Sequence, residues 1–465
     1  MMKKRAFRDE FDFVSETLKE IFSPAHLNQF ARETNFVQRE GKVDAKDFVA
    51  LCVFVSQKIG KDSLNELCGT LDAHRNTSLS AEGLNQRFNP AAVKFLKKVF
   101  SECLTKNVLE SSGFSHTFDQ FFNRIRILDS TAFGMPSDYS DQYKSPTGTG
   151  VKIQLEYELI RGDFLHLLVQ QGIASDQKTG QRLGDTIKPK DLCIRDLGYF
   201  SYDALEEIDD GDAYYLTRLK PSAAIYVVEK IDSASDRRYK RLYLEEVMEK
   251  MEPTETKEFE EVFIGGTAKL PTRLVVYKHT EEQTGKRLAA RNRKEKKKGV
   301  KYSRRIKKLS AITTYITNIP STYVSKHEIH SLYSIRWQIE ILFKTWKSLF
   351  SLDKVKKMKQ ERFECHLYGT LLSLLVSSMI TFKLRNLLYR KNKKEASEFK
   401  AMGIAKKYLV KIQEALLDKK ILLSEVIKKI YKMMEKNGRK SQRFKKKTVF
   451  DILGVSEGRE MEKAG

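Results

Sequence analysis

Cysteine and proline are both scarce in this chain of 465 residues, which contains 5 Cys and 9 Pro. So few prolines exclude a proline-rich scaffold. The cysteines stand far apart and none forms a Cys-x-x-Cys pair. This spacing disfavours a disulfide framework and a zinc ribbon, and it favours a reducing, cytoplasmic location.

Long apolar runs are also lacking. The longest covers residues 367–382, is interrupted by serine and threonine, and falls short of the ~20 residues that a bilayer span needs. We therefore expect a buried helix there and no membrane partner. The basic N-terminus is followed by Arg8, Asp9 and Glu10 instead of an apolar segment, so we expect no secretory signal.

Acidic residues are fewer than basic ones. The chain has 61 Asp and Glu against 85 Lys and Arg, which gives a formal net charge of +24. The surplus predicts a polyanionic partner, with nucleic acid as the first candidate and an anionic membrane surface as the second. Residues 286–308 carry 13 basic residues against one acid, and residues 391–465 carry 21 against 10. The denser run is either a solvated loop or a set of phosphate contacts, which gain affinity by releasing counterions.

The hydrophobic pattern changes along the chain. Residues 5–115 have helical spacing and are close to neutral. Strand-like alternation begins near residue 121 and continues, around the basic run, to about residue 320. Long helices are expected over residues 325–350 and 365–390, followed by lysine-rich helical sequence. The chain is therefore expected to have several domains of mixed α/β type.

Two aspartates follow apolar runs of strand type. Asp129 comes directly after Leu128, and Asp196 follows closely on Leu192, Cys193 and Ile194. We expect both at the carboxyl ends of strands, where catalytic groups are often placed. Taken alone, each aspartate fits a cap or a turn better than a catalytic site.

Glu340 lies in a stretch with amphipathic helical spacing. At 100° per residue, five side chains share an arc of roughly 80°: Tyr333, Arg336, Glu340, Lys344 and Lys347. The opposite face is apolar: Leu332, Ile335, Ile339, Leu342, Phe343, Trp346 and Phe350. The helix is thus expected to present a carboxylate flanked by cations. A surface helix with ordinary i,i+4 ion pairs would explain the charges but not the tyrosine.

These residues resemble the signature of the bacterial DDE transposases of the insertion-sequence-4 family: Tyr, two residues, Arg, three residues, Glu, six residues, Lys. The chain has this spacing at Tyr333, Arg336, Glu340 and Lys347. The family's two aspartate motifs match Asp129-Ser130-Thr131 and Asp196-Leu197-Gly198-Tyr199. The resemblance covers about residues 120–390.

The resemblance implies an α/β fold with an RNase H-like catalytic core that a β-rich insertion interrupts, between helical terminal regions. The implied parts are a helical domain at 1–120 that binds the element's ends, the core at 121–210 and 323–390, the insertion with its basic loop at 211–322, and a basic helical region at 391–465 that could dimerise.

The implied activity is metal-dependent DNA strand cleavage and strand transfer in cut-and-paste transposition. Asp129, Asp196 and Glu340 would hold two Mg²⁺ ions, which Mn²⁺ could replace, since hard cations prefer oxygen ligands. By the same resemblance, Tyr333, Arg336 and Lys347 would contact phosphates at the cleaved end; helix geometry alone adds Lys344.

The implied partners are duplex DNA, as terminal inverted repeats and target, and a second protomer on DNA, in the bacterial cytoplasm at the nucleoid. An aromatic side chain for a flipped base is also implied, and Tyr315 is either that residue or a buried strand tyrosine. A catalytically inactive DNA-binding regulator is the main alternative, although the intact acids and Tyr-Arg-Glu-Lys set argue against it. A membrane or RNA-binding protein would explain only the charge.

Overall fold

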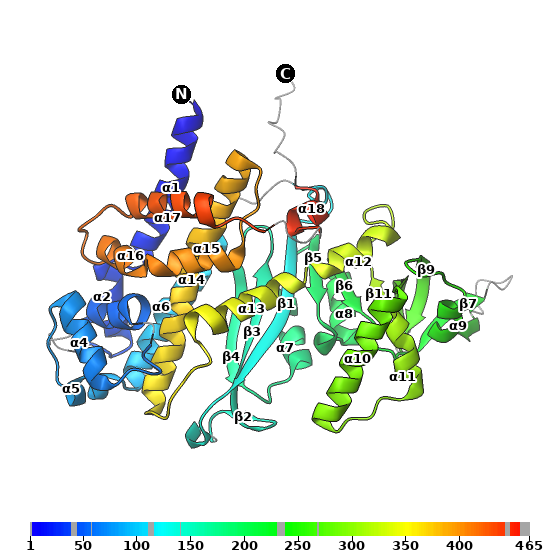
Figure 1. The fold of residues 1–465 in the computed structure, drawn as a ribbon, viewed down its shortest axis with the longest axis horizontal. Coiled ribbons are helices and arrows are strands. Elements are labelled where there is room, and N and C mark those ends of the chain that lie inside the picture. The colour runs from blue at the N-terminus through cyan, green and yellow to red at the C-terminus, as the bar shows by residue number, and fades with distance from the viewer. Residues whose placement is uncertain are drawn as a thin grey trace.

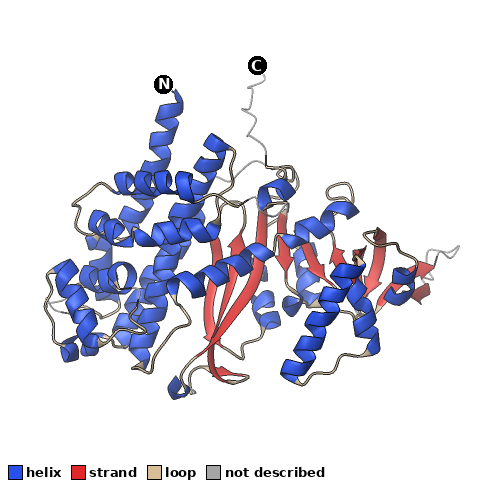
Figure 2. Ribbon diagram, viewed as in Figure 1, coloured by secondary structure: helices blue, strands red, loops and turns tan. Residues whose placement is uncertain are grey.

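The computed structural model describes residues 2–38, 44–56, 58–109, 116–139, 141–229, 238–266, 269–441 and 447–455. Helices from both ends of the chain gather at one side, and the sheet extends away from them (Figure 2). The fold is mixed α/β, as the sequence predicts.

The described strands form one mixed sheet in the order β2-β3-β1-β5-β6-β11-β10-β9-β7-β8, with β4 paired to β3. The first half contains β1 (Arg124–Gly134), β2 (Lys144–Ser145), β3 (Gly148–Glu158), β4 (Phe164–Gln171), β5 (Asp191–Arg195) and β6 (Tyr214–Arg218). The second half contains β7 (Ile225–Glu229), β8 (Arg238–Arg241), β9 (Thr256–Ile264), β10 (Leu270–Lys278) and β11 (Ile312–Thr317). Strand β1 runs antiparallel to β3 and parallel to β5, and β6 joins the two halves by pairing with both β5 and β11.

The N-terminal segment is helical, as predicted, and packs against helices from the other end of the chain (Figure 1). Its elements are α1 (Met2–Ile21), α2 (Pro24–Glu33), α3 (Ala45–Val49), the π-helical turn η1 (Ala50–Val55), α4 (Leu64–Arg75), α5 (Ala81–Arg87) and α6 (Pro90–Leu109). The C-terminal elements are α14 (Gln360–Asn392), α15 (Glu398–Lys407), α16 (Leu409–Leu416), α17 (Leu423–Asn437) and α18 (Val449–Leu453).

Helix α14 is the central helix of this group. It is long and apolar enough to cross a membrane, but 89% of its most apolar window is buried inside the protein. The buried hydroxyl of Ser373 is satisfied within the helix, since its Oγ donates to the backbone carbonyl of Gly369 at 2.9 Å. The prediction of a buried helix over residues 367–382 is therefore confirmed.

The basic run forms helices and not the loop that its composition suggested. Helix α10 (Glu281–Lys298) begins with a capping box in which Thr280 and Gln283 bond each other's backbone N–H groups, and it ends at Gly299 in the left-handed conformation. A short helix, α11 (Arg304–Lys308), follows. Lys294, Lys296 and Lys297 are exposed, so solvent screens their mutual repulsion. Arg287 instead folds back and donates to the carbonyls of Ser310 and Ile312.

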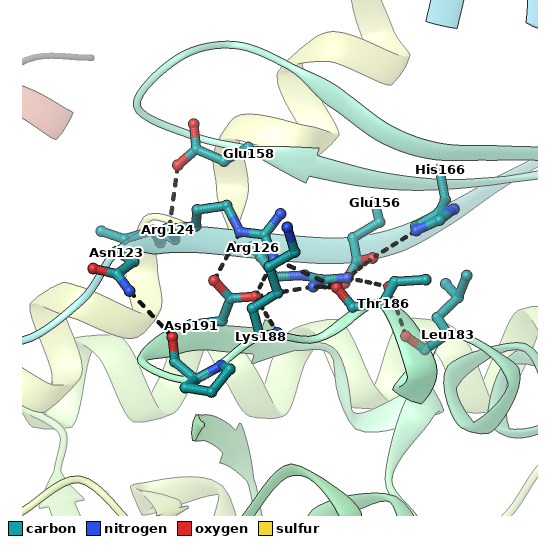
Figure 3. A network of polar contacts seen from close by, with 12 residues as sticks. Asn123, Arg124, Arg126, Glu156, Glu158, His166, Leu183, Thr186, Lys188 and Asp191 are labelled. Atoms are coloured by element: carbon teal, nitrogen blue, oxygen red, sulfur yellow. Dashed lines mark hydrogen bonds and ion pairs between the residues drawn. The ribbon is translucent and has the colours of Figure 1, made fainter. Parts of the chain in front are cut away.

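A buried ion network joins β1, β3 and β5 (Figure 3). Arg126 is 1% exposed and donates from Nε to Glu156 Oε1 at 3.1 Å and from Nη1 to Asp191 Oδ2 at 3.0 Å. Its guanidinium also donates to the carbonyl and the hydroxyl of Thr186, each at 2.7 Å. Arg124 shares Asp191. The network fixes the three strands to one another three residues before Asp129.

Replacing Arg126 with Leu should destabilise the fold strongly. The change leaves Glu156 without a guanidinium partner at a buried position, and breaking one partner of a buried pair costs about 3–5 kcal/mol. Urea denaturation would measure the loss. Lys240→Leu, which removes an exposed pair with Glu229, is the control and should change little; equal losses in the two variants would contradict the assigned role of the network.

Candidate active site

Two neighbouring parallel strands bring the aspartates together. The pairing of β1 with β5 ends at Leu128 opposite Arg195, so Asp129 and Asp196 are the next residues along the two strands. Asp196 directly follows β5, as predicted, and its Oδ2 accepts a hydrogen bond from Gly198 N at 3.4 Å. The expectation for Asp129 is wrong in one respect. It lies inside β1, which continues to Gly134 because β3 remains paired beyond the end of β5.

The third carboxylate, Glu340, lies in the second of two short helices, where the sequence predicted one continuous helix. Helix α12 (Lys326–Ser334) ends before Ile335 and Arg336, and α13 (Trp337–Phe350) begins after them and packs against β1 (Figure 1). The apolar face is buried as predicted: Leu332, Ile335, Ile339, Leu342, Phe343, Trp346 and Phe350. Tyr333 and Arg336 are also buried, however, at 7% exposure each, so the predicted polar face is only partly open to solvent.

The guanidinium of Arg336 lies among the three predicted carboxylates. Its Nη1 is 2.6 Å from Asp129 Oδ2, and its Nη2 is 2.5 Å from Glu340 Oε1. Its Nε is 3.7 Å from Asp196 Oδ1. A second guanidinium, that of Arg218 in β6, donates to the same oxygen of Asp196 at 3.0 Å. Residues far apart in the sequence thus meet at one cation.

Two factors set the electrostatics of the cluster: the burial of its carboxylates and the number of charges of each sign. Burial raises the pKa of Asp129 to about 6, against the opposing effect of Arg336. Burial also disfavours ionised Asp196, but Arg336 and Arg218 outweigh it and lower the pKa of that carboxyl. Three carboxylates against two guanidiniums leave one negative charge in excess, which is the condition for attracting a further cation.

The donor chemistry of this cluster fits hard divalent ions, because all three acids offer carboxylate oxygens. In this structure the three acids form ion pairs with Arg336 instead. Within the described residues, no group of three His, Cys, Asp or Glu side chains is placed to hold a metal ion. The guanidinium of Arg336 therefore takes the central position among these acids.

The predicted DNA-contacting side chains surround the cluster. The Tyr333 ring has Arg218 and Arg336 at 5.8 and 6.0 Å from its centroid. Lys347 Nζ donates to the carbonyl of Ala132 at 2.9 Å, and Lys344 is exposed without an ion pair to any described acid. A cleft of about 540 Å³ opens beside the third acid and is lined by Thr131, Glu340, Phe343, Lys344, Lys347, Ser348, Asp353 and Lys354.

Two residues at this site were missed by the sequence reasoning. Arg218 carries no motif, and only the pairing of β6 with β5 places it near Asp196. Trp337 is 60% exposed and follows Arg336 directly, but at 100° per residue it falls about 20° outside the arc of the polar side chains. Tyr315 is 2% exposed, and its hydroxyl lies 2.6 Å from His330 Nδ1, which agrees with the buried-strand alternative.

The chain is similar to known proteins over most of its length. Residues 120–376 match the family model described as Transposase DDE domain. The transposase for insertion sequence element IS231E of Bacillus thuringiensis subsp. finitimus is 40% identical over 461 residues, covering 97% of this chain and 96% of that protein. The transposase for IS1151 of Clostridium perfringens is 32% identical, covering 95% and 96%. The cryo-EM structure of the piggyBac transposase synaptic complex with hairpin DNA aligns with a TM-score of 0.47 at 10% identity, covering 90% of this chain and 85% of that chain.

Replacing Arg336 with Met should increase the stabilisation that divalent ions give to the DNA-free protein. The variant keeps three carboxylates but removes the cation among them, so an added ion meets less competition. A tenfold gain in affinity would add about 1.4 kcal/mol at saturating ion. Thermal unfolding with and without 10 mM Mg²⁺ measures the gain, beside Lys240→Met as the control. An ion-induced shift no larger than that of the unaltered protein would contradict the competition.

Proposed function

The chain belongs to the DDE transposases of insertion sequence elements, and from this premise we propose that it cuts and joins DNA strands with Asp129, Asp196 and Glu340. The observation that carries this assignment is the meeting of the three carboxylates at Arg336. The spacing of Tyr333, Arg336, Glu340 and Lys347 supports membership of the insertion-sequence-4 family.

We assign the half-sheet β4-β3-β1-β5-β6 to an RNase H-like core. This assignment moves β6 out of the insertion expected at 211–322, because β6 pairs in parallel with β5. Its first three strands are antiparallel, whereas β1, β5 and β6 are parallel to one another. Strands β7 to β11, with α10 and α11, would form the insertion, which extends the same sheet. Residues 1–120 would bind the element's ends, and residues 391–465 would contribute to a dimer.

Asp129, Asp196 and Glu340 would hold two Mg²⁺ ions, or Mn²⁺ in their place. Bound there, the ions would supply an activated water or 3′-hydroxyl and would stabilise the charge that develops on the attacked phosphate. The protein's own part is to keep the acids ionised and close together. Because Arg336 contacts all three, we infer that it must release them when ions bind.

A DNA phosphate is the natural new partner for Arg336, since a guanidinium binds phosphate in the same forked geometry as carboxylate. The approach of DNA would then free the carboxylates at the point where the scissile phosphate arrives. Tyr333, Lys344 and Lys347 would contact neighbouring phosphates. The exposed ring of Trp337 offers a face on which an unpaired base can stack.

Two DNA ends must be brought together in cut-and-paste transposition, so we propose a dimer on DNA, in the cytoplasm at the nucleoid. A catalytically inactive regulator remains the alternative function. It would share the DNA-binding surface but would not need the three acids to meet.

Glu340→Gln should abolish cleavage and strand transfer while DNA binding is retained. The amide keeps the shape of the side chain but removes the charge that an ion requires. Duplex ends copied from the DNA that flanks the gene, with a plasmid target and Mg²⁺ or Mn²⁺, would test this beside the unaltered protein. Cleavage by the variant would remove Glu340 from the site; binding without products from the unaltered protein would favour the regulator.

The cations of α10 should contribute to DNA binding without reading its sequence. Lys294, Lys296 and Lys297 are exposed and unpaired with any described acid. Changing all three to Gln should weaken binding to every duplex and reduce the salt slope by about one for each phosphate that is no longer neutralised. The matched triple change to Arg keeps the charge and should keep the slope. An unchanged slope in the Gln variant would mean that the helix face is only solvated.

A further inference from the structure

A fourth acid, Asp176, lies close to both aspartate motifs. It begins helix α7 (Asp176–Arg182), which packs against the turn that follows Asp196. Its Oδ1 accepts hydrogen bonds from Ser130 Oγ at 3.2 Å and Gln154 Nε2 at 3.0 Å, and Lys152 Nζ lies 3.2 Å away. One carboxylate oxygen therefore holds side chains from both β1 and β3.

The same network reaches the second motif. Gln154 is 1% exposed, and its Oε1 accepts a hydrogen bond from the hydroxyl of Tyr199, which is 2% exposed. Tyr199 ends the short turn Leu197–Tyr199 directly after Asp196. A Cβ on Gly198 in that turn would lie 3.4 Å from Asp176 Oδ2, so the carboxylate also packs against the turn itself.

The geometry places this network on the face of the sheet opposite Arg336. Successive side chains of a strand point to opposite faces, so Ser130 points away from the side that Asp129 faces. Ser130 also pairs in register with Gln154 of β3. In addition, Ser130 N donates to Asp129 Oδ1 at 2.8 Å, so a shift of Ser130 moves the neighbouring carboxylate directly.

We propose that Asp176 is a positioning residue that sets the distance between Asp129 and Asp196. It joins the residue after the first aspartate to the turn after the second, and among the described residues its side chain makes its hydrogen bonds to Ser130, Lys152 and Gln154, not to the three carboxylates of the cluster. The inference rests on the proposed function, because that distance matters only if the two carboxylates share metal ions. Groups that orient metal ligands typically change metal affinity 10–100-fold when removed.

The test is Mn²⁺ binding to the complex of the protein with a duplex element end, measured by the loss of the free-ion electron paramagnetic resonance signal. Asp176→Ala should raise the Mn²⁺ dissociation constant about tenfold. Asp176→Asn keeps an acceptor oxygen and should have a smaller effect. Binding of the DNA end in EDTA should stay within about twofold. Asp185→Ala, at an exposed acid without a described partner, is the matched control.

Ser130→Ala is a second variant, which removes one hydrogen-bond donor and leaves Asp176 in place. It should also raise the Mn²⁺ dissociation constant. Unchanged Mn²⁺ affinity in both Asp176→Ala and Ser130→Ala would overturn the inference, even if cleavage fell. If the unaltered protein bound DNA but showed neither Mn²⁺ binding nor cleavage, the proposed function would fail instead, which separates the two failures.

Discussion

The contact of Arg336 with three carboxylates is the interaction around which the site is organised. Three partly buried carboxylates close together repel each other, and burial raises the pKa of Asp129. One guanidinium reaches all three and lets them approach while charged. In the proposed function, the same contact competes with metal ions for these oxygens. The arginine would then support the metal-free site and would have to leave it when ions bind.

The rest of the fold positions the groups around that arginine. The parallel pairing of β1 with β5 places Asp129 beside Asp196, and α13 packs across β1 to bring Glu340 to them. The Arg126 network fixes the strands on one side of the acids. Asp176 links the two aspartate motifs on the same face of the sheet as Arg126, opposite Arg336. Each carboxylate is therefore held by elements far apart in the sequence, which is why one buried substitution can affect all three.

The sequence predicted the features that local pattern determines. Alternation predicted strands between residues 121 and 320, where the described strands lie, and the apolar face of α13 is buried as expected. The sequence predictions failed where contacts between distant segments determine the structure. Asp129 lies within β1 because β3 extends the strand, and Arg336 is buried because three acids compensate its charge. Arg218 and Asp176 have no signal of their own, since their roles arise from strand order and from side chains that meet only in the fold.

In the proposed function, the arrival of DNA releases the carboxylates from Arg336. The most direct test is a titration with Mn²⁺ of the free protein and of its complex with a duplex element end, followed by the resonance of unbound Mn²⁺. We expect weak Mn²⁺ binding to the free protein and two tightly bound ions per site in the complex. Equally tight binding of both ions to the free protein would contradict it, because Arg336 would then not compete for the acids.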